Sequence, residues 1–530
     1  MELRVPIADL AVLLGSEAAT LDSDGLRAKL AHFYGFLPDS AEVRVDRDVV
    51  VLSWPDATTS NKAEAERLAQ KAAQRAQRGE HAKARDILKA ALGLDPSLGD
   101  ARRDLAMVCV EMGEMDEAKN HLIEVLKLNP SDAWALVILA NNYVREDEDF
   151  DTAKRFLQRA LELKPDDPWA MNSLAAVLTQ TGDAEEGMKL CEEILRKHPG
   201  FAIPYMNKAL WLVKEQKFAE AASVLREMFK CDEAQDARAA TAFAQGRSTY
   251  VKVQNFIANN KRSQSEVLVD QLAAKAGELS GFTVRVTTGP LEALVAAKIA
   301  MAWKHGTDHH LLTIREGDIP EILKDHHALH ELHHVLLESE ARKAGTNRWF
   351  ITTPGSRNTA FASMDKEVRQ MQRKGYEPDA IAQGVNQLYH GAVGFLYNCP
   401  LDMLIEQRIR RDYPQIEEVQ FCGVAQLAHD ALTVTMRKDL RDFVPPTLQR
   451  INDALNGAYA LFVDDLLEHA TDFAASYHPM PSFALSQKLY GMWKESSASF
   501  RPGAEYELVD AFGDQLGIRD WYSWKADQVP

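Results

Sequence analysis

Residues 116–130 read DEAKNHLIEVLKLNP, and the pattern recurs in residues 82–96, AKARDILKAALGLDP, and in residues 151–165, DTAKRFLQRALELKP. Each stretch spaces its apolar residues along one helical face and ends in proline, which cannot continue a helical hydrogen-bond ladder. Such closing prolines lie 34 or 35 residues apart, at Pro96, Pro130, Pro165 and Pro199. A fixed period of this length predicts a solenoid of stacked helix pairs.

Two further sets of residues repeat in the same register. Small residues mark the expected helix crossings, at Ala84, Ala118, Ala153, Gly187 and Ala221. Glycines mark the turn within three of the units, at Gly79, Gly113 and Gly182. Small side chains let paired helices approach closely, and glycine suits a tight turn. Five units therefore fit the sequence, at residues 64–96, 97–130, 131–165, 166–199 and 200–233.

This pattern resembles the tetratricopeptide repeat. The resemblance implies a concave groove that binds a peptide or a protein surface. In the register of that family, Trp134 and Trp169 look into the groove. Asn141 and Asn172 lie on the same face, where they could hydrogen-bond an extended backbone. The alternative is that both tryptophans pack against neighbouring repeats.

The composition of the 530 residues excludes several classes of protein. A net charge of -17 argues against nucleic-acid binding, which needs clustered lysine and arginine. No apolar run reaches the roughly 18 residues of a membrane span, and the N-terminus has no signal-peptide pattern. The five cysteines are scattered, without a CxxC pair, and predict reduced thiols in a cytoplasmic protein.

The sequence predicts a multidomain, mainly α-helical chain. Residues 1–58 form a small α/β unit with a helix at 22–36 and a hairpin at 42–54, and residues 60–235 hold the repeats. The period ends after Asp236, and residues 236–530 form an α+β domain. Its expected elements are strands at 281–289 and 309–314 and helices at 239–276, 290–303 and 321–343.

The expected helix 321–343 contains the motif HExxH, as His330-Glu331-Leu332-His333-His334. Because His330 and His334 are four residues apart, both imidazoles leave one helical face and can bind one metal ion. Glu331 can accept a proton from a metal-bound water, whose pKa zinc lowers from ~15.7 to about 7. The alternative is a histidine-rich helix face exposed to solvent.

The motif and the strand before it resemble the zincins, a family of zinc metallopeptidases. In zincins, a strand that aligns the substrate precedes the helix that carries HExxH. The metzincin pattern does not fit, because Leu337 and Glu340 stand where that subclass has glycine and histidine. The gluzincin pattern implies a third zinc ligand, a glutamate, from a later helix.

Residues 398–414, NCPLDMLIEQRIRRDYP, contain the best candidates for that ligand. If Pro400 opens a helix, Asp402 and Glu406 share one face. We expect Glu406 to bind zinc and Asp402 to orient a histidine. The order of the two carboxylates is the reverse of that in some gluzincins, which leaves open which one touches the metal. For Glu406, the alternative is a surface salt bridge with Arg410.

The hypothesis is a zinc-dependent peptidase that hydrolyses protein substrates, with the repeats recruiting substrate or regulating activity. One alternative is a non-enzymatic scaffold with a structural metal or none, and another is a zinc hydrolase acting on a non-peptide amide. Residues 345–361, GTNRWFITTPGSRNTAF, are a candidate lid or cleavable loop. Candidate donors to a developing oxyanion, chosen by residue type alone, are Tyr389, His390, Tyr397 and His429.

Overall fold

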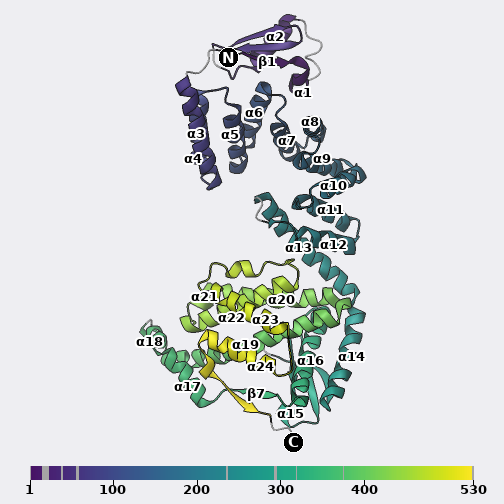
Figure 1. Ribbon diagram of the computed structural model, residues 1–530, viewed down its shortest axis with the longest axis vertical. Coiled ribbons are helices and arrows are strands. Elements are labelled where there is room, and N and C mark those ends of the chain that lie inside the picture. The colour runs from purple at the N-terminus through teal and green to yellow at the C-terminus, as the bar shows by residue number, and fades with distance from the viewer. Residues whose placement is uncertain are drawn as a thin grey trace. The chain divides into compact units, whose positions relative to one another are not determined.

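The structure, a computed structural model, describes residues 2–14, 23–37, 40–54, 59–233, 237–291, 295–317, 319–373 and 375–527 (Figure 1). The chain divides into two compact units, Met1–Lys208 and Ala209–Pro530. Across the described ranges, no helix combines the length and the apolar character needed to cross a bilayer.

The repeats fold as successive helix pairs, as their period predicts. The first helices of the pairs are α3 (Thr59–Gln77), α5 (Gly99–Met112), α7 (Ala133–Asn142), α9 (Pro168–Thr181) and α11 (Ala202–Lys214). The second helices are α4 (His81–Leu94), α6 (Met115–Leu128), α8 (Phe150–Leu163), α10 (Ala184–Lys197) and α12 (Phe218–Met228). All five small residues predicted at the helix crossings are buried. The division between the two units falls within α11.

The turn within each pair places one residue in the left-handed backbone region. Three pairs use the predicted glycines, Gly79 (φ 74°), Gly113 (φ 78°) and Gly182 (φ 100°). The other two pairs use Glu148 (φ 51°), after a π-helical turn over Tyr143–Asp147, and Gln216 (φ 59°). The left-handed backbone conformation of the turn is therefore present even in the two pairs that have no glycine at this position.

The N-terminal residues form a small sheet in the order β1-β3-β2. Its elements are β1 (Glu2–Pro6), a 3-10 turn (Ile7–Leu10), α1 (Ala11–Leu14), α2 (Ser23–Phe33), β2 (Glu42–Asp46) and β3 (Val49–Ser53). The predicted helix and hairpin are confirmed, while β1, which pairs antiparallel with β3, was not predicted. The sheet packs on the repeats, where the Tyr34 hydroxyl donates to the Lys127 carbonyl at 3.0 Å and Leu128 joins the core.

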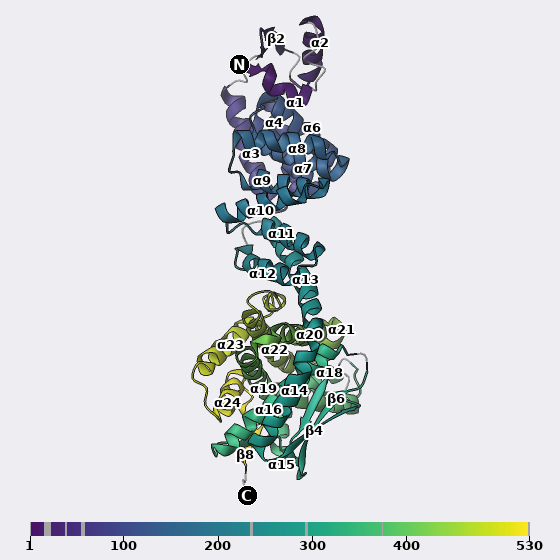
Figure 2. The ribbon, with the colours of Figure 1, turned by 90° about the vertical axis from the view of Figure 1, so that its right-hand side faces the viewer.

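The second unit begins with α13 (Ala237–Asn260) and α14 (Arg262–Ser280). A sheet in the order β4-β6-β5 follows, with β6 parallel to β4 and antiparallel to β5. Its elements are β4 (Thr283–Gly289), β5 (Ala297–Ala300), α15 (Ala302–His305) and β6 (His309–Arg315). Helix α16 (Glu321–Lys343) packs against α14 and against β5 and β6 (Figure 2).

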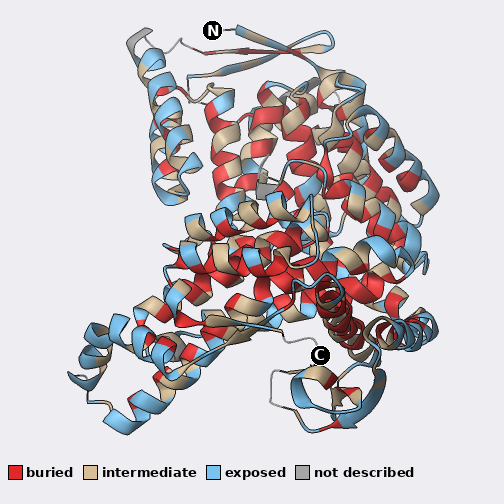
Figure 3. Ribbon diagram, turned by 60° about the horizontal axis from the view of Figure 1, so that its bottom comes forward, coloured by how far each residue is buried: buried red, intermediate tan, exposed pale blue. Residues whose placement is uncertain are grey.

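The rest of the second unit is mostly helical. Its elements are β7 (Arg348–Ile351), α17 (Pro354–Ser363), α18 (Asp365–Arg373), α19 (Pro378–Asp412), a 3-10 turn (Pro414–Ile416), α20 (Glu417–Met436), α21 (Lys438–Arg441), α22 (Pro446–Leu466), a 3-10 turn (Ala474–Tyr477), α23 (Phe483–Ser497), α24 (Ala504–Leu516), a 3-10 turn (Arg519–Trp521) and β8 (Ser523–Ala526). Helix α16 packs against α19 and α20, and both of these pack against α22. Buried residues line the inner faces of the helices (Figure 3).

Three expectations from the sequence are wrong in this unit. The helix expected at 290–303 is instead β5 followed by the short α15, because pairing with β6 decides the conformation of an apolar run that periodicity leaves ambiguous. Pro400 does not open a helix but lies buried inside α19, where tertiary packing outweighs the lost hydrogen bond. Residues 345–361 are not a loop, since they form β7, paired with β8, and most of α17.

Candidate metal centre

Helix α16 presents the two histidines of the motif on one face. The ring centroids of His330 and His334 lie 5.1 Å apart, and both side chains are partly buried. His333, between them, points elsewhere: it is buried, its Nδ1 contacts the Leu329 carbonyl at 2.7 Å and its ring packs on Tyr413. The helix therefore separates the two candidate ligands from a histidine that serves packing.

A carboxylate from α19 lies opposite the two rings. Oδ1 of Asp402 lies 3.4 Å from Nε2 of His330 and 3.5 Å from Nε2 of His334. That oxygen is buried and accepts no hydrogen bond within the described part of the chain. One ligand atom from each of these three residues lies within 4.8 Å of the other two, so the group could hold one metal ion.

Glu406, one turn further along α19, lies behind His330 and is fully buried. Its Oε1 accepts a hydrogen bond from Nδ1 of His330 at 2.7 Å. Its Oε2 accepts from Nε2 of His326 at 3.1 Å and from the Gln420 side chain at 2.9 Å. Because a carboxylate can only accept, Nδ1 of His330 carries the proton, which leaves Nε2 to face Asp402.

This geometry exchanges the roles that the sequence suggests for the two carboxylates. Asp402, expected to orient a histidine, lies beside both Nε2 atoms, whereas Glu406, expected to be the third ligand, orients His330 from behind. The cause is the packing of α16 and α20 against α19, which brings His326 and Gln420 to the carboxylate of Glu406. A surface salt bridge between Glu406 and Arg410 is excluded, since Glu406 is buried and Arg410 pairs with Glu417 at 3.1 Å.

Helix α20 closes the back of the site. Gln420 donates to both the carboxylate and the backbone carbonyl of Glu406. Gly423 lies against His326, and a Cβ atom there would fall 2.1 Å from Nδ1 of that ring. His326, one turn before His330 on α16, is therefore a buried support of Glu406.

The charges of the site reinforce one another. Burial disfavours protonation of His330, but the neighbouring carboxylates of Asp402 and Glu406 outweigh it and raise the pKa of His330 well above its usual value. Burial would raise the pKa values of both carboxylates, but the neighbouring histidines keep the pKa of Asp402 below its usual value and that of Glu406 well below it. Without a cation, the protonated histidine therefore balances the charge of the two ionised carboxylates.

Glu331 lies beside the cluster and contacts the last strand of the sheet. Its Oε2 accepts a hydrogen bond from the backbone N–H of Ile299 in β5 at 2.9 Å. Strand β5 ends the order β4-β6-β5 and pairs only with β6 among the described strands. The carboxylate of the motif is thus held between the face of α16 that carries His330 and His334 and an edge strand.

Two carboxylates beyond the motif on α16 are engaged elsewhere, as are the candidate oxyanion donors Tyr389 and Tyr397. Glu338 contacts Trp303 at 3.3 Å, and Glu340 forms a bidentate ion pair with Arg408. Tyr389 is buried and donates to the Trp521 carbonyl at 2.7 Å, while Tyr397 contacts Glu338. His390 and His429 are exposed.

A tyrosine that the sequence did not single out lies near the cluster. Burial, and then the charges of Glu406 and Asp402, raise the pKa of Tyr459 in α22 well above its usual value. The hydroxyl is thus within electrostatic range of both carboxylates. No spacing in the sequence relates this position to the motif, since only the packing of α22 on α19 brings them together.

The groove residues of the repeats form an aromatic run. The rings of Trp134 and Trp169 lie 6.2 Å apart, edge to face, and Trp169 meets Phe201 at 4.8 Å. Both tryptophans are half-buried, so they pack against neighbouring repeats and still keep exposed surface. Asn141 is exposed, and Asn172 accepts a hydrogen bond from the Asn207 side chain at 2.9 Å.

A second group with ligand-type side chains lies in the repeats, at Cys109, Glu114 and Glu117. Each carboxylate already has a cation, since Arg85 contacts Glu114 at 2.6 Å and Lys89 contacts Glu117 at 2.7 Å. Burial and the two carboxylates raise the pKa of Cys109 to about 11. A protonated thiol beside satisfied carboxylates does not make a metal site.

Comparison with known proteins identifies the repeats. Residues 68–140 and 144–208 match the sequence model of the tetratricopeptide repeat. These two stretches are tetratricopeptide repeats. Residues of the candidate metal centre lie outside the matched range. No curated protein matches the chain.

Three similar solved structures cover 30% to 38% of this chain. One is MamA, with 22% identity over 30% of this chain and 92% of that one, at a TM-score of 0.27. Another is PilF of Pseudomonas aeruginosa, with 20% identity over 38% of this chain and 93% of that one, at a TM-score of 0.31. A third is YrrB, described as a tetratricopeptide-repeat protein with an unusual peptide-binding site. It has 23% identity over 34% of this chain and 92% of that one, at a TM-score of 0.27.

Proposed function

We propose that this protein is a zinc-dependent peptidase whose tetratricopeptide repeats bind a protein or peptide partner. The supporting observation is the convergence of Nε2 of His330, Nε2 of His334 and the unpartnered Oδ1 of Asp402. Two imidazoles and one carboxylate are a ligand set that suits zinc and leaves one position for water. His330, His334 and Asp402 are therefore the proposed metal ligands, with Glu406 and His326 behind them.

The residues of the chain divide the reaction among them. When bound, zinc supplies an acidified water and polarises the scissile carbonyl. Glu331 accepts the proton of the attacking water and passes it to the leaving amine. Glu406 fixes the ring of His330, since its carboxylate holds Nδ1–H at 2.7 Å.

The edge strand β5 is the proposed alignment site for the substrate. An extended peptide can add to an exposed strand edge by backbone hydrogen bonds. The contact between Ile299 N–H and Glu331 puts the proposed base next to that edge. A peptide aligned on β5 therefore brings its backbone close to the proposed base, which favours a peptide over a small amide as substrate.

The repeats are the proposed site of recruitment. Half-buried Trp134 and Trp169 offer aromatic surface, and the exposed Asn141 offers an amide for hydrogen bonds to a backbone. Whether the bound protein is the substrate or a regulator is decided by comparing the wild type with Trp169→Ala. A higher KM for one substrate indicates recruitment, and a changed rate on all substrates indicates regulation.

The decisive experiment measures zinc per chain together with casein hydrolysis. We expect about one zinc in the wild type, none in Asp402→Ala, and binding about 10- to 100-fold weaker in Glu406→Gln. The variant Glu331→Gln should keep zinc and lose about 100-fold or more in hydrolysis.

Other outcomes select other functions. If Asp402→Ala keeps its zinc while Glu406→Gln loses it, Glu406 is the ligand after all. Stoichiometric zinc without hydrolysis in the wild type identifies a scaffold with a structural metal. Hydrolysis of small amides but not of casein identifies a non-peptide amide hydrolase, and metal-free protein rejects the zinc site.

A further inference from the structure

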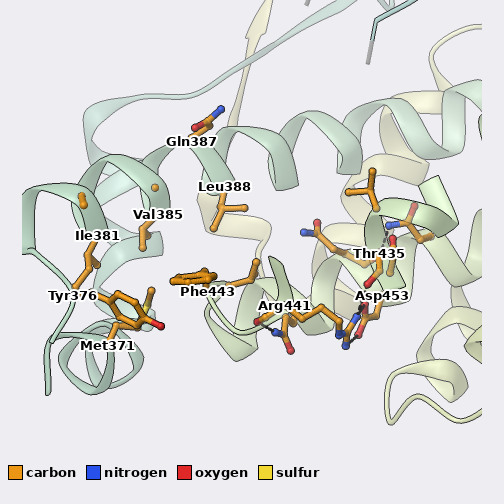
Figure 4. Close-up of a pocket in the computed structure, with 17 residues that line it drawn as sticks. Met371, Tyr376, Ile381, Val385, Gln387, Leu388, Thr435, Arg441, Phe443 and Asp453 are labelled. Carbon is orange, nitrogen blue, oxygen red and sulfur yellow. Dashed lines mark hydrogen bonds and ion pairs between the residues drawn. The ribbon is translucent and has the colours of Figure 1, made fainter. Parts of the chain in front are cut away.

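The second unit contains a large apolar pocket away from the metal centre. Its volume is about 650 Å³, within the range of ligand sites in proteins. The walls come from the N-terminal half of α19, the ends of α18 and α20, the segment after α21 and the start of α22. Figure 4 shows Ile381, Val385 and Leu388 of α19 on the side facing Phe443.

The rim of the pocket carries exposed apolar side chains. Phe443 is 51% exposed and Val434 39%. Only eight large apolar residues are this exposed among the described residues, and two of them line this pocket. Such a concentration marks a binding surface, because isolated exposed apolar residues are common but clusters are not.

The charged groups of the pocket cancel each other. Arg441 forms two contacts of 2.8 Å with the carboxylate of Asp453 (Figure 4). The guanidinium is thus already committed, and a ligand carboxylate or phosphate would find no free cation on Arg441. The pocket therefore suits an uncharged ligand.

Amide groups accompany the apolar wall. Asn456 donates to the backbone carbonyl of Asn452 at 2.9 Å, while the Asn452 side chain forms no hydrogen bond within the part of the chain that the structure describes. A peptide backbone offers the donors and acceptors that such an amide needs, and an acyl chain does not. Apolar side chains of a peptide would fill the remaining space.

We propose that this pocket binds an apolar segment of the peptide substrate, at a distance from the bond that is cleaved. The proposal rests on the proposed peptidase function. Leu388 and Asp402 are fourteen residues apart on α19, which spans about 21 Å at 1.5 Å per residue. An extended peptide covers that distance in about six residues. The pocket thus selects substrates with apolar side chains about six residues from the scissile bond.

The test uses full-length Glu331→Gln protein and two fluorescein-labelled peptides. The peptides are identical except that one carries Leu-Phe where the other carries Ser-Ser. We expect the Leu-Phe peptide to bind at least about 10-fold more tightly, and Phe443→Ala to remove that preference. Phe256→Ala is the matched control, because Phe256 is similarly exposed, at 48%, but lies on α13.

Each outcome bears on one of the two proposals. Equal binding of both peptides, or an equal effect of Phe443→Ala and Phe256→Ala, overturns the pocket proposal. Tight binding of oleate that Phe443→Ala removes, without binding of the Leu-Phe peptide, also overturns it in favour of a lipid site. If the Leu-Phe peptide binds through Phe443 but the zinc-loaded wild type hydrolyses no peptide, the peptidase proposal fails while peptide binding by the pocket holds.

Discussion

The repeats and the candidate metal centre differ in how far apart along the chain their interacting residues lie. In the repeats, residues pair with the next unit, as Arg85 does with Glu114 and Arg103 with Asp132, each 29 residues away. In the candidate metal centre, His330 and His326 contact Glu406, which lies 76 and 80 residues later in the chain. The repeats therefore make the same type of contact at several positions, whereas the candidate metal centre depends on individual residues that occur only once.

Two tight glycines, one in each region, sharpen this comparison. The largest effect is expected from Gly423→Ala, because the new Cβ would overlap the His326 ring, 2.1 Å from Nδ1 and 2.3 Å from Cγ. Moving that ring breaks its hydrogen bond to Glu406. We expect a loss of about 3 kcal/mol in the free energy of unfolding and weaker zinc binding, measured by thermal unfolding and zinc titration.

Gly394→Ala is the control for that variant. Gly394 also lies in a helix of the second unit, and a Cβ there meets nothing within 4 Å. This change should leave zinc binding intact and stabilise the helix by about 0.5 to 1 kcal/mol. Unchanged zinc affinity in Gly423→Ala would show that the centre tolerates movement of His326.

The next effect concerns a buried carboxylate. Burial raises the pKa of Glu505 to about 7, although its backbone hydrogen bonds, including one from the Gly503 N–H at 2.8 Å, lower it. Because the folded pKa exceeds the ordinary value of 4.5, the stabilisation present below pH 4.5 is lost as the pH rises through 7. The loss amounts to about 3 kcal/mol at most.

In Glu505→Gln, the free energy of unfolding of the second unit should therefore change less between pH 4.5 and 7 than it does in the wild type. The measurement is the free energy of unfolding of both proteins at pH 5 and pH 8, by urea titration. The wild type should lose more stability than the variant over this range. Parallel pH profiles would mean that Glu505 titrates normally and that the second unit resembles the repeats, whose carboxylates are paired at the surface.

The smallest effect is expected in the repeats. Ala occupies four of the five crossing positions, but at Gly187 a Cβ would lie 2.8 Å from the Ala175 carbonyl and 2.6 Å from the Thr179 hydroxyl. Gly187→Ala should cost about 1 to 2 kcal/mol without changing zinc content. Gly93→Ala, in open space on α4, is the control, and it should stabilise the helix by about 0.5 to 1 kcal/mol. A change of zinc content in Gly187→Ala would contradict the view that the repeats and the candidate metal centre are independent of each other.

The sequence predicts the repeats well because their information is local and repeated. Period, proline and small residues fix the helix pairs, and even the turns at Glu148 and Gln216 follow the register despite lacking glycine. In the second unit, the helix that carries HExxH was predicted at its observed bounds, since its signal is also local. The strand β5 was missed because its conformation comes from pairing with β6.

The order of the two carboxylates could not be resolved from sequence for the same reason. Asp402 and Glu406 share a helical face, so periodicity alone treats them alike. What separates them is the packing of three helices: α20 brings Gln420 to Glu406, and α16 brings His326 to its other side. The place of Tyr459 depends likewise on the packing of α22, for which no motif exists.

The long separation between His330 and Glu406 also sets an order during synthesis of the chain. His330 is made 76 residues before Glu406, the carboxylate that orients it. At about 5 to 20 residues per second, that interval lasts about 4 to 15 s. During this interval the chain already holds α14, β5 and β6, against which α16 packs, and the proposed set of ligands is complete only after α19 has emerged.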